Sequence, residues 1–333
     1  MAPVLTSLDP SFGPLTGGNT VQIIGSGFTG PLTVMFGSTA TTFTLVSDTR
    51  ITAIAPPGTD TVEVTVAALL DGTSNPLPYT YNCSGLLFFT DNDLPGTVYS
   101  VPQTGGTPTM PTADLIAPSG LVRVGDLLYI CENGANRVSA VPITGGTPTP
   151  LITGLASPID ITASGDTLFI TNEVTDQVVS APITGTDTPT VITTSPTNVF
   201  GITDGSPTRS GLTLLFFTDV ANPGTVYSVP RAGGTPTVLA TGLSFPTGLV
   251  RIGDLIYICE NGLNRVSTVP VVGGTPTPLV TGLAAPTDIT ASGSTLFITN
   301  SATDQVMSAP ITGTDTPTAV ATSPTDLIFG ITT

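Results

Sequence analysis

The chain lacks several residue types on which common enzyme chemistry depends. Its 333 residues include no histidine, no lysine and no tryptophan. The absence of histidine excludes a Ser-His-Asp triad, a Cys-His pair and a histidine-ligated zinc ion. A carboxylate pair for glycoside hydrolysis stays open, because that chemistry needs only Asp or Glu. The missing tryptophan and the low aromatic content of 6% argue against it, since ligand pockets are commonly lined by aromatic side chains.

Charge is also scarce, and it is almost all of one sign. The seven basic residues are all arginine, 23 residues are Asp or Glu, and the formal net charge is −16. Such a surface repels polyanions, so we expect no nucleic-acid partner and no anionic-membrane partner. The outer surface must consist largely of Thr, Ser, Asn and Gly. A hydroxyl-rich surface suits contact with proteins or sugars, and solubility alone is the alternative explanation.

Long hydrophobic runs and a cysteine framework are missing as well. No apolar stretch is long enough to cross a bilayer, so we expect no membrane insertion. The opening residues, MAPVLTSLDP, lack the basic start and apolar run of a secretion signal. The three cysteines are odd in number, which argues against a disulfide framework. Cys131 and Cys259 lie in two apolar strands far apart in the sequence and are expected to be inert buried thiols; the third is Cys83.

The spacing of the apolar residues predicts an all-β protein, because no segment keeps helical apolar spacing for more than a turn or two. In residues 1–82, short alternating apolar runs are separated by Gly, Pro and Asp turns, which is typical of a small β-sandwich. The motifs TGGNTVQIIGSGF, SDTRITAIAPPG and closing YTY resemble the IPT/TIG family of immunoglobulin-like domains. This resemblance implies a binding or spacer module of the kind found in surface receptors, adhesins, carbohydrate enzymes and phage structural proteins.

Six units of about forty residues follow residue 82. Each contains an apolar strand that ends in an acid or amide: LFFTD at 87, LYICE at 128, LFITN at 168, LFFTD at 215, IYICE at 256 and LFITN at 296. Repeats of this length with several strands each are typical of propeller blades. We therefore predict a six-bladed β-propeller over 83–333. It is built from two copies of a three-blade unit, because DLLYICENGANRVSAVP at 126 is nearly repeated as DLIYICENGLNRVSTVP at 254.

The ends of this array predict how the ring closes. The first unit begins directly with its second strand, LLFFTD, and the chain ends on a spare inner strand, DLIFGIT, at 326–332. Pairing the C-terminal strand with the first blade completes six equal blades and removes two free sheet edges.

The segment PSGLVRVGDLLYICENGANRV resembles the repeats of NHL-like six-bladed propellers. The resemblance implies a fold shared by protein-binding scaffolds, lyases and calcium-dependent lactonases of the gluconolactonase type, so it does not choose a function. Because the blades are nearly identical, we expect no asymmetric pocket in the ring.

The residues that end the second strands are the candidate functional side chains. Carboxylate and amide oxygens gathered on one face are ligands for a hard cation such as Ca²⁺. The metal candidates are therefore Asp91, Glu132, Asp219 and Glu260, with Asn172 and Asn300 at the same position and Asp160 and Asp288 nearby. The alternative is that these side chains cap the turns that follow each strand. Arg123, Arg137, Arg251 and Arg265 form symmetric pairs that are expected to make salt bridges with neighbouring acids.

Two functions from different classes follow. The first is a non-enzymatic structural or binding protein on an exterior surface. On a virion it would be a phage capsid decoration or a fibre-like component, and on a cell surface it would be an adhesion component. In it the TIG domain docks, the propeller is presented to proteins or glycans, and no cofactor is needed. The alternative is a calcium-dependent, lactonase-like propeller enzyme with an accessory TIG domain.

Overall fold

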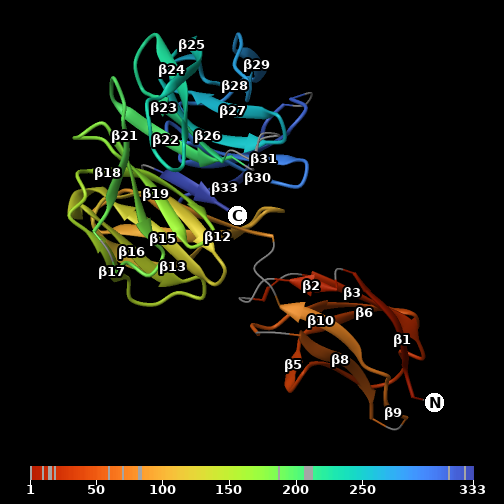
Figure 1. The fold of residues 1–333 in the computed structure, drawn as a ribbon. Helices are drawn as coiled ribbons and strands as arrows, with labels where there is room; N and C mark the ends of the chain where they lie inside the picture. Colours follow the sequence, from red (N-terminus) through yellow and green to blue (C-terminus); the bar gives the residue numbers. More distant parts are fainter. Residues whose placement is uncertain are drawn as a thin grey trace. The chain divides into compact units, whose positions relative to one another are not determined.

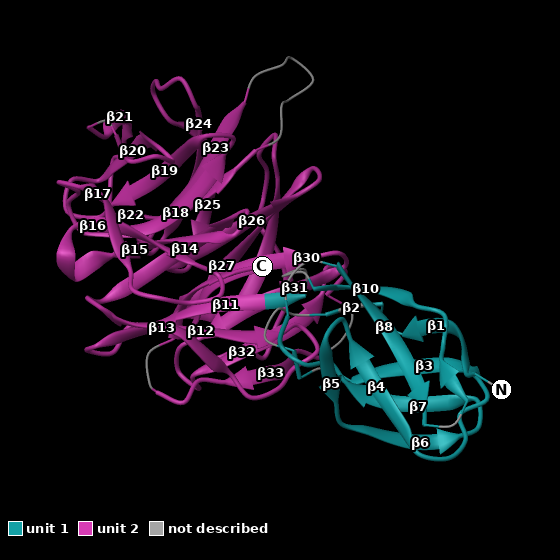
Figure 2. Ribbon diagram, turned by 90° about the horizontal axis from the view of Figure 1, so that it is seen from below, with its two compact units in different colours: residues 1–86 teal, residues 87–333 magenta. Residues whose placement is uncertain are grey.

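The computed structural model describes residues 2–9, 11–13, 17–18, 20–58, 61–69, 71–81, 85–186, 188–205, 213–313, 316–325 and 328–333. The regular secondary structure of the described chain is almost entirely β-strand, and the chain divides into two compact units, residues 1–86 and 87–333 (Figures 1 and 2). The boundary predicted at residue 82 falls in 82–84, outside the described residues, as does Cys83. No helix in the described ranges is long and apolar enough to cross a membrane.

The first unit is a sandwich of two sheets. One sheet has the order β1 (Val4–Asp9), β3 (Thr20–Ser26), β7 (Arg50–Ile54) and β6 (Phe43–Ser47). The other has the order β2 (Phe12–Gly13), β10 (Leu77–Tyr81), β8 (Thr61–Ala68), β4 (Leu32–Phe36) and β5 (Thr39–Thr41), with β9 (Gly72–Thr73) paired to β8. Alternation places every second residue between the sheets.

The core of this sandwich follows directly from that alternation. Val21 and Ile23 of β3 are fully buried, as are Val64 and Val66 of β8. Tyr79 packs edge-on against Phe36, with ring centroids 5.0 Å apart. Aromatic pairs in this arrangement stabilise a core by about 1 kcal/mol beyond the area they bury.

The second unit consists of six four-stranded antiparallel sheets, the architecture of a β-propeller. Two one-turn 3₁₀ helices, η1 (Asn133–Ala135) and η2 (Asn261–Leu263), are its only helical turns in the described residues. Listed from centre to rim, the first sheet is β34 (Ile328–Thr332), β11 (Leu86–Asp91), β12 (Gly96–Pro102) and β13 (Thr109–Leu115), and the second is β14 (Pro118–Val124), β15 (Leu127–Glu132), β16 (Arg137–Pro142) and β17 (Thr149–Thr153). The third sheet is β18 (Pro158–Ser164), β19 (Thr167–Asn172), β20 (Gln177–Pro182) and β21 (Thr190–Thr194), and the fourth is β22 (Val199–Asp204), β23 (Leu214–Asp219), β24 (Gly224–Pro230) and β25 (Thr237–Leu243). The fifth sheet is β26 (Pro246–Ile252), β27 (Leu255–Glu260), β28 (Arg265–Pro270) and β29 (Thr277–Val280), and the sixth is β30 (Pro286–Ser292), β31 (Thr295–Asn300), β32 (Gln305–Pro310) and β33 (Thr318–Thr322).

The inner strands form a ring around the centre of this unit. Each of β14, β18, β22, β26 and β30 contacts the next, and β34 contacts both β30 and β14. The C-terminal strand β34 pairs antiparallel with β11, with Phe89 opposite Ile331. Figure 2 shows the C-terminus beside β11. The first and last parts of the propeller sequence therefore share one sheet.

Neighbouring sheets pack face to face through apolar side chains. Tyr129 and Cys131 of the second sheet lie in one cluster with Ile161, Leu168 and Ile170 of the third. An equivalent cluster in the second copy of the repeat joins the fifth and sixth sheets. Each sheet is thus buried on both faces, which explains why the second strands are continuous apolar runs.

Candidate functional site

The four carboxylates predicted as metal ligands end the second strands of four different sheets. Asp91 ends β11, Glu132 ends β15, Asp219 ends β23 and Glu260 ends β27. All four are buried, with at most 4% of the residue exposed. A buried carboxylate needs charged or hydrogen-bonding partners, so those partners define what each one does.

Glu132 is held by its own sheet and by the loop that enters that sheet. The Arg137 guanidinium donates from Nε to Oε1 at 2.7 Å and from Nη2 to Oε2 at 2.9 Å. The Ser139 hydroxyl donates to Oε1, and the Ile116 N–H donates to Oε2 at 2.9 Å. Burial raises the pKa of Glu132, but these hydrogen bonds and the charge of Arg137 outweigh it and lower the pKa below its usual value.

Glu260 repeats this arrangement one copy later. It accepts hydrogen bonds from Arg265 at 2.7 Å, from the Ser267 hydroxyl and from the Ser244 N–H at 3.0 Å. The salt bridges predicted for Arg137 and Arg265 are present. Duplicated residues therefore perform the same structural task in both copies.

Asp91 and Asp219 bind the loop that enters the inner strand of their sheet. The hydroxyls of Ser323 and Thr325, just before β34, donate to Asp91 Oδ2, the first at 2.8 Å. The Thr197 hydroxyl, just before β22, donates to Asp219 Oδ2. These carboxylates thus fix the crossing from one sheet to the next, as turn-capping side chains do.

The structure does not bring the four metal candidates together. Within the ranges described above, no three His, Cys, Asp or Glu side chains lie close enough to hold a metal ion. The observed hydrogen bonds are those of the capping alternative. Asn172 shares this role through the Ala156 N–H, which donates to its Oδ1 at 3.3 Å.

Asp160 and Asp288 lie elsewhere, in the wall of a central cavity of about 170 Å³ that is lined by all six inner strands. Each carboxylate bridges two neighbouring inner strands. Asp160 accepts from the N–H groups of Ile161 and Ile202, and Asp288 accepts from those of Ile289 and Ile331, all at 2.8 Å. These two residues tie β18 to β22 and β30 to β34.

Glycine makes room for the two central carboxylates. The equivalent position of the other four inner strands is glycine: Gly120, Gly201, Gly248 and Gly330. A Cβ atom on Gly120 would lie 2.5 Å from Asp160 Oδ1, too close for any other residue. This Gly-Asp-Gly pattern, repeated in both halves, is the sequence signal that could have placed the pair in the centre.

Burial changes the ionisation of this pair. Desolvation raises the pKa of Asp160 to about 7, although its two backbone hydrogen bonds oppose the change. Desolvation, followed by the charge of Asp160, also raises the pKa of Asp288. Burial and the adjacent aspartate likewise raise the pKa of the Cys131 and Cys259 thiols, so these thiols are unreactive.

The immunoglobulin-like unit has an exposed edge at β6, which pairs with β7 alone in its sheet. Leu45 and Val46 on this strand are 43% and 46% exposed. Val4 of β1 and Ile54 of β7, in the same sheet, are also exposed. An edge strand that carries exposed apolar side chains is a template for pairing with another protein.

Comparison with known proteins supports both halves of the fold. Residues 3–81 match the IPT/TIG domain family. A chain in a crystal structure of a nidogen–laminin complex is similar in structure, with a TM-score of 0.65 and 22% identity; the match covers 74% of this chain and 97% of that one. An auxiliary nutrient binding protein from Bacteroides ovatus has a TM-score of 0.54 and 14% identity, with 96% and 86% covered.

These identities show the fold alone. No curated protein matched the sequence. The predicted all-β fold of an immunoglobulin-like sandwich followed by a propeller is confirmed, whereas the assignment to NHL-like propellers stays a prediction.

Proposed function

We propose that the chain is a non-enzymatic binding protein displayed on the exterior of a virus particle or a cell. In this proposal the immunoglobulin-like domain docks on a protein of that surface, and the propeller is presented to other proteins or to glycans. The exposed apolar edge strand β6 is the observation that carries the proposal. An unpaired edge offers backbone N–H and C=O groups together with apolar contacts, which is how strand-addition interfaces form.

The carboxylates support a binding role rather than turnover. Glu132 and Glu260 are fully buried and paired with arginine, so their charge stabilises the sheets. The acidic, lysine-free composition points to a protein or glycan partner and away from nucleic acid.

The docking proposal is tested with the full chain. We expect Leu45→Asp and Val46→Asp to weaken binding to the parent particle or cell surface at least tenfold, because a charge would be desolvated in the interface. The matched control is Val272→Asp, which places the same charge on a propeller residue that is 88% exposed and should leave docking unchanged.

Two results would contradict this assignment. Docking that is lost in Val272→Asp and kept in Leu45→Asp would move the interface to the propeller. Hydrolysis of lactones or glycosides by the purified chain at a useful rate would make it an enzyme.

A further inference from the structure

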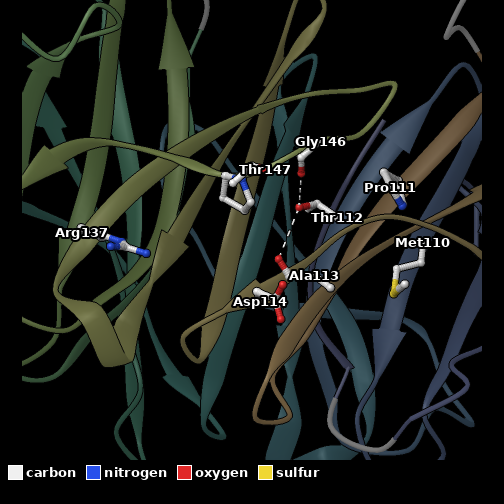
Figure 3. A pocket seen from close by; sticks show the side chains of 9 residues that line it. Met110, Pro111, Thr112, Ala113, Asp114, Arg137, Gly146 and Thr147 are labelled. Atoms are coloured by element: carbon white, nitrogen blue, oxygen red, sulfur yellow. Dashed lines mark hydrogen bonds between the residues drawn. The ribbon is translucent and has the colours of Figure 1, made fainter.

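A pocket of about 290 Å³ lies at the rim of the propeller, between the outer strand of the first sheet and the second sheet (Figure 3). Strand β13 contributes Met110, Pro111, Thr112 and Asp114 to its lining. The second sheet contributes Arg137 and the turn around Gly146. The side chains that line it on β13 are not repeated in the second copy of the three-blade unit.

The internal duplication provides a reference for this pocket. The equivalent outer strand, β25, has Leu239, Ala240 and Gly242 where β13 has Pro111, Thr112 and Asp114. The backbone hydrogen bond between the outer strand and the next sheet is the same in both copies. The Gly146 N–H donates to the Pro111 carbonyl at 3.2 Å, and the Gly274 N–H donates to the Leu239 carbonyl at 3.1 Å. The lining is one of the places where the two copies differ, at five consecutive positions, 110–114 in the first copy and 238–242 in the second.

One of these differences replaces a glycine by a charged residue. The backbone at Asp114 has a φ of 63°, and its counterpart Gly242 has a φ of 83°. Glycine adopts this left-handed region freely, and aspartate is among the few other residues that also adopt it. The exchange therefore adds a carboxylate at this position without changing the backbone conformation. Asp114 is exposed, so that side chain is accessible to a ligand.

The polar groups of the pocket include both donors and acceptors. Asp114 offers carboxylate oxygens, which only accept. Arg137 uses Nε and Nη2 to bind Glu132, and Nη1 has no hydrogen-bond partner among the residues that the structure describes. The Thr112 hydroxyl donates to the Gly146 carbonyl at 2.8 Å, which leaves its oxygen able to accept (Figure 3).

This combination favours a ligand that has both hydrogen-bond donors and acceptors. An ionised carboxylate only accepts hydrogen bonds and cannot pair with Asp114, while an ammonium group only donates and cannot pair with Arg137. A hydroxyl group does both. The volume lies near the lower end of small-molecule pockets, about 300 Å³, which limits the ligand to one compact unit.

We propose that this rim pocket binds a single uncharged sugar unit, with hydroxyl groups between Asp114 and Arg137 and the apolar face of the ring against Met110 and Pro111. The proposal rests on the binding function proposed above and names its ligand class. Hydrogen bonds and aliphatic contacts hold the sugar here, without an aromatic platform.

The test measures binding of D-glucose, D-galactose, D-mannose and N-acetyl-D-glucosamine to the full chain by saturation-transfer NMR and titration calorimetry. We expect at least one of them to bind. The double variant Thr112→Ala/Asp114→Gly should weaken that binding at least tenfold. It carries the residues that β25 has at the same positions, so it should fold, with a slightly lower melting temperature because the Thr112 hydroxyl no longer donates to the Gly146 carbonyl.

The control is Thr241→Ala, which makes the same kind of change on β25, at the position equivalent to Ala113, and should leave affinity unchanged. An array of glycans ending in the same units separates a free sugar from a glycan terminus as the source of the ligand. Failure of all four sugars to bind, or binding that survives Thr112→Ala/Asp114→Gly, would overturn the proposal.

These outcomes separate the site from the docking function. If no sugar binds while docking stays sensitive to Leu45→Asp, the sugar site is wrong and the docking role stands. If sugar binding follows Asp114 while docking ignores Leu45, the site stands and the docking role is wrong.

Discussion

Glu132 shows how a residue that suggests a metal ligand in the sequence becomes structural in the fold. The carboxylate has no solvent exposure, while Arg137 keeps 26% of its side chain exposed. Removing one member of such a pair would leave a buried charge without compensation, which typically costs about 3 kcal/mol. The acid at the end of the strand is therefore required by the sheet itself, and its repetition in the other copy follows from duplication.

The central pair, Asp160 and Asp288, predicts a pH-dependent stability. Burial raises the pKa of Asp160 from 3.8 to about 7, and it raises the pKa of Asp288 in the same direction. The folded state then binds more protons than the unfolded state between about pH 4 and 7. This contribution to stability is complete below pH 4 and is lost as the pH rises through 7. The charge of Asp160 contributes to the raised pKa of Asp288, while backbone N–H groups on the inner strands oppose both shifts.

Thermal unfolding between pH 4 and pH 9 tests this prediction. We expect the melting temperature of the wild type to fall through this range, and the double variant Asp160→Asn/Asp288→Asn to show a clearly smaller fall. Asp126→Asn, which removes one exposed carboxylate, should keep the wild-type slope. Equal slopes in the wild type and the double variant would show that the pair ionises normally.

At the scale of elements, the sequence predicted strands well because alternation and turn residues are local signals. The strand LYICE predicted at 128 is observed as Leu127–Glu132, and the strand LFITN predicted at 168 is observed as Thr167–Asn172. The bridges made by Asp160 and the rim pocket at Asp114 were not predicted. Both depend on which backbone groups of a neighbouring sheet lie opposite a side chain, and periodicity within one strand does not contain that information.

The C-terminal strand β34 is the element whose loss should affect the ring most. It supplies the inner strand of the first sheet, the Ile331 N–H that donates to Asp288, and the Gly330 N–H that donates to the Thr90 hydroxyl. Deleting residues 328–333 should expose the edge of β11 and leave Asp288 without one partner. We expect a melting temperature lowered by more than ten degrees or a tendency to associate, measured by calorimetry and light scattering.

The matched control for this deletion is Ile328→Val, which gives β34 the first residue of its counterpart β22. Removing one methylene from a buried site should cost about 1 kcal/mol. A truncated chain that melts like the wild type and stays monomeric would exclude β34 as a structural strand of the ring.

At the scale of the whole molecule, the propeller consists of two nearly equivalent halves. Elements of the first half recur in the second half with matching bounds: β15 at Leu127–Glu132 corresponds to β27 at Leu255–Glu260, and η1 corresponds to η2. Phe200 and Phe329, on opposite inner strands, meet with ring centroids 5.6 Å apart. Because of this pseudo-two-fold symmetry, each half presents the strand edges and sheet faces with which the other half pairs and packs.

This symmetry predicts that one half can assemble with itself. Strands β11 and β23 have the same sequence, LLFFTD, and β34 pairs with β11 as β22 pairs with β23: Phe88 lies opposite Thr332, and Phe216 lies opposite Thr203. In a fragment of residues 213–333, β34 of one copy can therefore pair with β23 of a second copy, and two copies would close a symmetric six-sheet ring. We expect light scattering to give twice the fragment mass, with the circular dichroism of a β-protein. The same fragment without residues 328–333 should not dimerise, because it has no strand to exchange. A folded monomer, or a dimer that forms equally well without those residues, would show that the two halves are not interchangeable.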